Sequence, residues 1–143
     1  YVTGTNDKLK EKIYKEYNAE KDLLDKCVKF CGYVDNSVLE DYYTQCRFLL
    51  YTSKREGFGL PVLEMALRGK TAVASSVTSI PEVLGASVYY VDPYDVDSIA
   101  SGIAYMNSDE HLKVYETSVM NLKDDIRNKI NVNMDILIYD ILN

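Results

Sequence analysis

Residues 48–75 read FLLYTSKREGFGLPVLEMALRGKTAVAS, and this stretch decides the fold class. It opens with the apolar run 48–51 and closes with a second apolar run, 71–74. Such runs are typical of strands that helices cover on both faces. Between them, a helix is predicted over 60–68, because Pro61 suits the first helical turn and Gly69 suits the position just past the last. A strand, a helix and a second strand in close succession predict a parallel arrangement.

The same alternation is predicted upstream. Asn6 is expected to cap a helix that ends near Asn18, because apolar residues recur there at helical spacing. A short strand-like run follows at 28–31, and Ser37–Glu40 has the form of a capping box that begins another helix.

Downstream, residues 87–91 are predicted to form a strand, and Asp95 is expected to cap a helix. Two further helices are expected over 109–127 and 132–142. The whole pattern predicts an α/β fold with a Rossmann-like, doubly wound parallel sheet, whose ligands bind beyond the carboxyl ends of the strands. At 143 residues and 47% hydrophobic, residues 1–143 are expected to form one domain.

Charge and cysteine content narrow the function class. The formal net charge is −6, so the chain has no broad positive field for a nucleic acid, and no nucleic-acid partner is expected. Its three cysteines, Cys27, Cys31 and Cys46, lack the paired spacing of a zinc site or a disulfide framework, which favours buried thiols in a reducing compartment. No apolar stretch approaches the roughly 20 residues of a membrane-spanning helix. The expected location is cytoplasmic, with attachment to the inner membrane surface left open for the full-length protein.

The turn before the helix at 60–68 is the candidate site. Gly57 and Gly59 flank Phe58, and without Cβ atoms they allow positive φ and close approach of backbone amides to a ligand. The helix start behind them offers N–H groups with positive partial charge. Together these features predict a cradle for a diphosphate.

Two carboxylates bracket this turn. Glu64 lies about one turn inside the helix and could accept hydrogen bonds from the 2′,3′-diol of a ribose, whereas Glu56 could reach hydroxyls on the other side of the same diphosphate. The alternative is that both decorate solvated faces, since a Gly-x-Gly turn is common in α/β domains. Lys54, Arg55 and His111 are interpreted as solvated or surface residues outside the site.

The segment Glu56–Ala66 closely resembles the E-x7-E signature of the group 1 glycosyltransferases, which have the GT-B fold. The resemblance extends in order and spacing through 69–76, 80–85 and 91–93, and 28–34 resembles the family's strand and base-contacting loop. It covers about residues 1–107. This resemblance implies the C-terminal, donor-binding domain of such an enzyme.

The family implies transfer of a sugar from a UDP-, GDP- or ADP-linked donor to a glycan, lipid or other acceptor, with retained anomeric configuration and with no metal or other cofactor. Glu56 would be the catalytic residue that bonds hydroxyls of the donor sugar, and Glu64 would bind the ribose. The residues between them would contact the donor sugar and the phosphate: Gly57, Phe58, Gly59 and Leu60. Hydrolysis by the two acids is discounted, because both are occupied in binding hydroxyls.

The chain also departs from the family pattern. The N-terminal acceptor domain, the first strand of the C-terminal domain and the following Arg/Lys pair are missing, so the chain by itself is expected to be inactive. Loss of a central strand should leave a gap or force its neighbours together, which predicts low stability or strand-swapped self-association. A non-catalytic α/β module that binds a nucleotide or a protein partner remains the alternative. The donor base, the sugar and the acceptor are not legible from the sequence.

Overall fold

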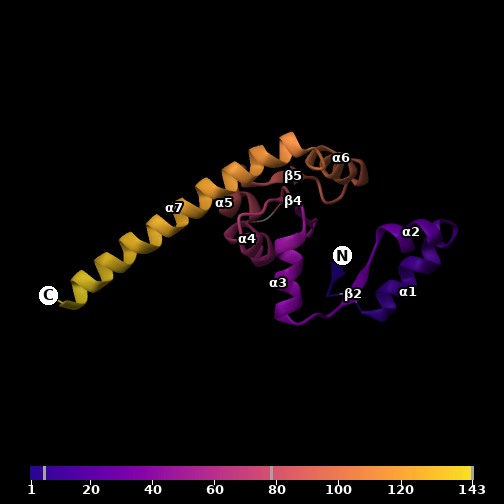
Figure 1. The fold of residues 1–143 in the computed structure, drawn as a ribbon, viewed down its shortest axis with the longest axis horizontal. Helices are drawn as coiled ribbons and strands as arrows, with labels where there is room; N and C mark the ends of the chain where they lie inside the picture. Colours follow the sequence, from indigo (N-terminus) through magenta and orange to yellow (C-terminus); the bar gives the residue numbers. More distant parts are fainter. Residues whose placement is uncertain (5, 78, 143) are drawn as a thin grey trace. The chain divides into compact units, whose positions relative to one another are not determined.

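The computed structural model (Figure 1) describes residues 1–4, 6–77 and 79–142, and side-chain environments through residue 128. Contacts divide the chain into two compact units, Tyr1–Gln45 and Cys46–Asn143. The expectation of one domain over 1–143 stays a prediction.

The first unit holds a pair of short parallel strands, β1 (Val2–Thr3) and β2 (Phe30–Gly32). Its helices are α1 (Asp7–Glu16), the short 3-10 helix η1 (Asn18–Glu20), α2 (Lys21–Cys27) and α3 (Asn36–Gln45). The predicted cap of α1 is confirmed, because the backbone N–H of Leu9 donates to Asn6 Oδ1 at 2.9 Å.

Some details of this unit differ from the sequence prediction. Helix α2 was not predicted, because its seven residues are too few to show a repeated apolar spacing. Helix α3 begins at Asn36 instead of after Ser37. The thiol of Cys27 is exposed and those of Cys31 and Cys46 are partly so, which corrects the expectation of buried cysteines.

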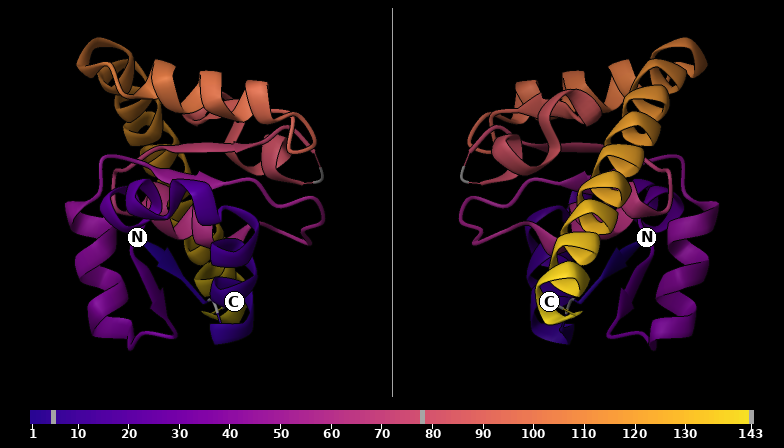
Figure 2. Two further views of the ribbon diagram at one scale, coloured as in Figure 1. Left: turned by 90° about the vertical axis from the view of Figure 1, so that its right-hand side faces the viewer. Right: turned by 90° about the vertical axis from the view of Figure 1, so that its left-hand side faces the viewer.

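The second unit is a three-stranded parallel sheet in the order β3 (Leu49–Tyr51), β4 (Ala72–Ser75), β5 (Tyr89–Val91). Its helices follow the strands in alternation: α4 (Leu60–Leu67), α5 (Ile80–Leu84), the 3-10 turn η2 (Gly85–Ser87), α6 (Val96–Met106) and α7 (Asp109–Leu142). Figure 2 shows α6 running along the sheet and α7 crossing behind it. The β3–α4–β4 order is the one predicted from residues 48–75.

The core explains why β4 lies in the middle. All four of its residues are buried. Ala72 and Ala74 pack into one apolar cluster with α4, α5 and α7, whereas Val73 packs into a second cluster with Met106 of α6 and Leu112 of α7. The prediction that helices cover the strand at 71–74 on both faces is therefore confirmed for β4.

Strand β3 is different, because it lies at an end of the three-stranded ladder. The side chain of its middle residue, Leu50, is 45% exposed. The prediction that helices cover this strand on both faces is wrong for that side chain.

The C-terminal part of the chain forms one helix, whereas two were predicted. Residues 109–142 form one helix, α7, because neither Pro nor Gly occurs in that range to end it. The apolar stripe expected from Met134 to Ile141 lies outside the described side chains. Within the described residues, no helix is long and apolar enough to cross a membrane.

Candidate functional site

The candidate site is the turn that leads from β3 into α4. The left-handed conformation of Gly59, with φ +76° and ψ +39°, places it at the N-cap of α4. Its carbonyl oxygen accepts from the N–H groups of Val62 at 3.0 Å and Leu63 at 3.2 Å. Pro61 has no N–H, so among the described residues the amides of Gly59 and Leu60 are the donors at this helix tip for which the structure records no backbone carbonyl acceptor.

The two glycines of the turn have different roles. A Cβ on Gly59 would lie 3.0 Å from Cγ1 of the buried Ile80, and its positive φ disfavours any other residue type. Gly57 is not among the described glycines with positive φ, and a Cβ there would meet nothing within 4 Å. Of the two glycines, Gly59 adopts the positive φ that was expected and Gly57 does not, whereas the expected close approach of backbone amides to a ligand stays a prediction.

Hydroxyl groups hold the backbone of the turn in place. Ser75, the last residue of β4, donates from Oγ to the carbonyl oxygen of Ser53 at 2.6 Å. Ser79 donates from Oγ to the carbonyl oxygen of Gly57 at 2.7 Å. Ser53 in turn donates to the carbonyl oxygen of Arg55 at 2.9 Å. The path of the turn is therefore fixed through its own carbonyl groups.

Glu56 sits between these anchored points. Its side chain is partly buried, and its Oε2 accepts a hydrogen bond from the phenolic hydroxyl of Tyr51. Glu56 could be identified from the sequence, whereas Tyr51 was predicted only as part of an apolar strand. The five-residue spacing is the only signal in the sequence, and it does not by itself predict the contact.

The remaining predicted site residues lie on the solvent side. Phe58 is 49% exposed and Leu60 is 57% exposed. Glu64 is exposed and lies four residues after Leu60, on the same face of α4. Its backbone carbonyl accepts from Arg68 Nη1 at 2.7 Å. The structure thus places Glu56, the tip of α4 and Glu64 on one strand-turn-helix segment, with neither carboxylate in the core.

The basic residues and the histidine excluded from the site have other contacts. Lys54 Nζ lies 4.9 Å from the centroid of the Tyr94 ring, on the loop that follows β5. His111 stacks on Tyr105 with ring centroids 3.7 Å apart, and its Nδ1 lies 3.0 Å from the Tyr105 carbonyl oxygen. His111 therefore has a packing role where α6 meets α7.

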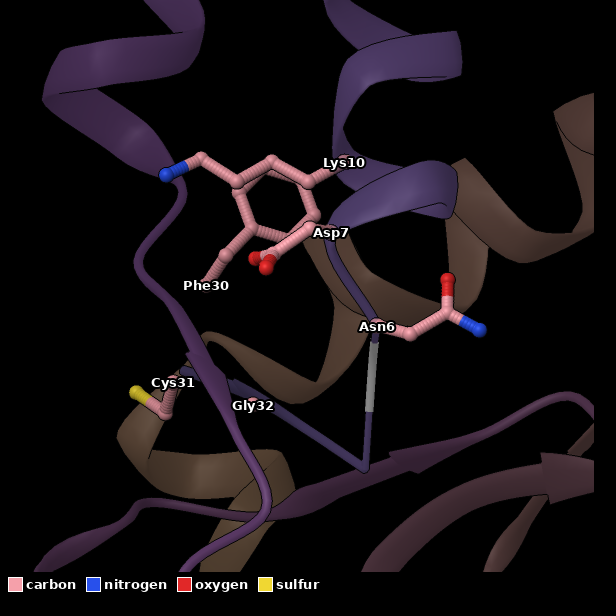
Figure 3. Close-up of a pocket in the computed structure, with 6 residues that line it drawn as sticks. All are labelled: Asn6, Asp7, Lys10, Phe30, Cys31 and Gly32. Atoms are coloured by element: carbon pink, nitrogen blue, oxygen red, sulfur yellow. The ribbon is translucent and has the colours of Figure 1, made fainter.

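A cavity of about 190 Å³ lies in the other unit (Figure 3). It is bordered by the start of α1 and by β2, and its lining residues are Asn6, Asp7, Lys10, Phe30, Cys31 and Gly32. Figure 3 shows the side chains of Asp7, from the start of α1, and of Phe30, from β2, at this cavity. The β2 side of this cavity belongs to the segment 28–34 that resembles a base-contacting loop.

Several known proteins resemble this chain. The O-antigen chain mannosyltransferase B of Escherichia coli is 38% identical over 91 residues, which are 64% of this chain and 24% of that protein. The serotype-specific mannosyltransferase WbdA of Escherichia coli is 37% identical over 70 residues, 49% of this chain and 9% of that protein. The chain thus spans about a quarter or less of the length of these relatives.

The third likeness concerns the fold. The solved structure of sucrose-phosphate synthase from Thermosynechococcus elongatus superposes with a TM-score of 0.71 at 23% identity, over 92% of this chain and 33% of that one. The likeness confirms the predicted α/β fold of the GT-B type.

A family model described as "Glycosyl transferases group 1" matches residues 2–126, which include the whole segment from β3 through α6. The match also contains Glu56, the glycine turn and Glu64. This chain belongs to the group 1 glycosyl transferases.

Proposed function

We propose that this chain is the donor-binding part of a retaining glycosyltransferase, which moves a sugar from a nucleoside diphosphate to an acceptor. The observation that carries the proposal is the strand-turn-helix segment that contains the tip of α4. Glu56 lies just before this tip, the Leu60 amide lies at it, and Glu64 lies one turn inside the helix. A helix tip with an available amide favours an anion such as a diphosphate. A carboxylate on either side supplies acceptors for sugar hydroxyls.

The chemistry follows from this arrangement. Departure of the diphosphate builds negative charge, which the α4 dipole and the backbone amides of the turn stabilise. Glu56 accepts hydrogen bonds from hydroxyls of the donor sugar and holds the sugar in place for attack. Glu64 accepts hydrogen bonds from the hydroxyls of the ribose. Gly57, Phe58 and Gly59 supply backbone amides near the sugar. The net charge of −6 does not prevent this, because helix-tip amides act at short range.

The names of the relatives support a sugar and an acceptor class. Two of them are mannosyltransferases, and one is described as acting on the O-antigen chain. The proposed donor is accordingly a nucleoside diphosphate mannose, and the proposed acceptor is a growing polysaccharide. The acceptor is expected to bind through a part of the protein other than residues 1–143, at the cytoplasmic side of the membrane.

Calorimetric titration tests the donor site. GDP-mannose, UDP-glucose, GDP and UDP are titrated into this chain and into three variants. Glu64→Ala is expected to weaken both bare and sugar-linked nucleotides, whereas Glu56→Ala weakens mainly the sugar-linked form. Glu110→Ala, an exposed carboxylate at the start of α7, is the matched control for lost negative charge. Binding that is the same in all three variants would contradict the donor site and favour an interaction module.

Self-association through β3 is part of the proposal. Strand β3 ends the ladder, and among the described residues only β4 pairs with it. Open strand edges are a template for pairing with a second chain. Sedimentation of this chain as a monodisperse monomer at all concentrations would count against self-association and leave the donor site standing.

A further inference from the structure

We infer that Tyr51 is a positioning residue for Glu56, which fixes the carboxylate in the orientation that receives the donor sugar. The inference rests on the proposed function, because it assigns a purpose to a hydrogen bond within the proposed donor site. Its physical basis is the bond from the Tyr51 hydroxyl to Glu56 Oε2.

The donor of this bond is itself held in place. Tyr51 is the last residue of β3, and its backbone pairs in register with Ala74 of the buried strand β4. Its ring packs against the apolar cluster formed by β4, α4 and α5. A ring held in this way presents its hydroxyl at one point. Forming the bond to Glu56 therefore costs little further conformational entropy of the Tyr51 side chain.

The acceptor lies on a turn that is fixed on both sides. The carbonyl groups of Ser53 and Gly57, three residues before Glu56 and one after, accept hydrogen bonds from Ser75 and Ser79. The backbone at Glu56 is thereby set, and the freedom that remains is that of its side chain. A glutamate side chain has three rotatable bonds, and a hydrogen bond to one oxygen selects a small part of their range.

The bond leaves a defined group for a ligand. The phenol takes one lone-pair direction of Oε2, which leaves Oε1 and the other lone pair of Oε2 in defined positions to accept hydrogen bonds from sugar hydroxyls. Hydrogen bonds that involve a charged group are stronger than neutral ones, so the orientation persists in a partly exposed site. A preformed acceptor avoids the cost of ordering the carboxylate when the donor binds.

A control exists in the same unit. The Tyr90 hydroxyl donates to the Gly85 carbonyl oxygen at 2.7 Å, and its ring also packs against the same apolar cluster. Tyr90→Phe therefore removes one phenolic hydrogen bond from the unit without touching Glu56. Tyr51→Phe removes the one that reaches Glu56.

The decisive experiment is a double-mutant cycle in this chain, with GDP-mannose, UDP-glucose, GDP and UDP as probes. Tyr51→Phe is expected to weaken the sugar-linked nucleotides by about five- to tenfold, because the Glu56 side chain must then be ordered when the sugar binds, and bare nucleotides by less than about twofold. In the Glu56→Ala background, Tyr51→Phe is expected to cause no further loss. Tyr90→Phe should leave all four affinities unchanged.

Each outcome decides between the two claims. If Glu56→Ala weakens the sugar-linked form while Tyr51→Phe does not, or if the two losses add, the positioning role is overturned and the donor site stands. If Glu56→Ala changes nothing, the donor site itself fails. A measurement without ligand applies in every case: the carboxyl ¹³C resonance of Glu56, assigned by its loss in Glu56→Gln, should move in Tyr51→Phe and stay in Tyr90→Phe. An unmoved resonance in Tyr51→Phe overturns the inference whether or not a nucleotide binds.

Discussion

The two glycines of the donor turn allow a paired test of the structure. Gly59→Ala and Gly57→Ala are the same chemical change two residues apart. Both gain the same small stabilisation from a less flexible unfolded chain, about 0.4–1 kcal/mol, so this term cancels between them. What differs is the folded state at each position.

The magnitude follows from the geometry at each glycine. At Gly59, an alanine must adopt φ +76°, which costs about 1–2 kcal/mol. Its Cβ also lies 3.0 Å from Cγ1 of buried Ile80, and such overpacking costs about 1–3 kcal/mol. At Gly57, neither cost applies. The free energy of unfolding of Gly59→Ala should therefore be lower than that of Gly57→Ala by roughly 2–5 kcal/mol.

Urea unfolding followed by circular dichroism gives the difference, and hydrogen exchange of the β4 amides assigns it to the unit Cys46–Asn143. Sugar-linked nucleotides should bind Gly57→Ala nearly as well as the parent chain and Gly59→Ala more weakly, because the turn is displaced. The reasoning is refuted if the two variants have the same stability, or if Gly57→Ala is the more damaging one.

Further predictions concern the packing, the pH response and the turn. Gly102→Ala should lower the free energy of unfolding by about 2 kcal/mol, because its Cβ would lie 2.6 Å from Val91 Cγ1; urea unfolding measures this, with Ala104→Gly as the control for helix propensity, and an unchanged midpoint argues against it. Burial raises the pKa of Tyr90 to about 12, so its contribution to stability is complete below the unfolded value near pH 10 and is lost as the pH rises through about 12. Between about pH 10 and 12, the free energy of unfolding should fall less steeply with pH in Tyr90→Phe than in the parent chain. Equal slopes in the two proteins would contradict this. Ser79→Ala should accelerate amide exchange around Gly57 with a stability loss of about 0.5–1 kcal/mol, and unchanged exchange would show that its hydroxyl does not hold the turn.

Helix boundaries marked by specific residues could be predicted from the sequence. Pro61 and Gly69 bracketed α4, and Asp95 accepts from the Asp97 N–H at 2.9 Å, as a cap of α6 should. These signals are local, because the backbone requirement and the residue that meets it are neighbours in the chain. The prediction of two helices where α7 is one was wrong because such a local signal is absent there. A polar stretch was interpreted as a break, although that range has no residue that ends a helix.

The candidate site was only partly predictable for a related reason. The carboxylates and the glycine turn are contiguous, so Glu56, Gly59 and Glu64 could be identified by type and spacing. The hydroxyls that hold the turn come from residues 22 positions away along the chain, and their partners are carbonyl groups that every residue has. Which of two glycines needs its missing Cβ likewise depends on Ile80, a residue brought close only by packing.

The donor turn is tied down by its main chain, and this has a consequence for how the protein can be altered. Ser75 and Ser79 donate hydrogen bonds to backbone carbonyl oxygens. Every residue type has this carbonyl group, so the bonds do not depend on the side chain at the accepting position. The side chains at 54, 55 and 58 all point to solvent. A library that randomises these three positions should therefore retain the fold in most of its members while varying the surface offered to a sugar, which makes this turn a practical place to redesign donor preference.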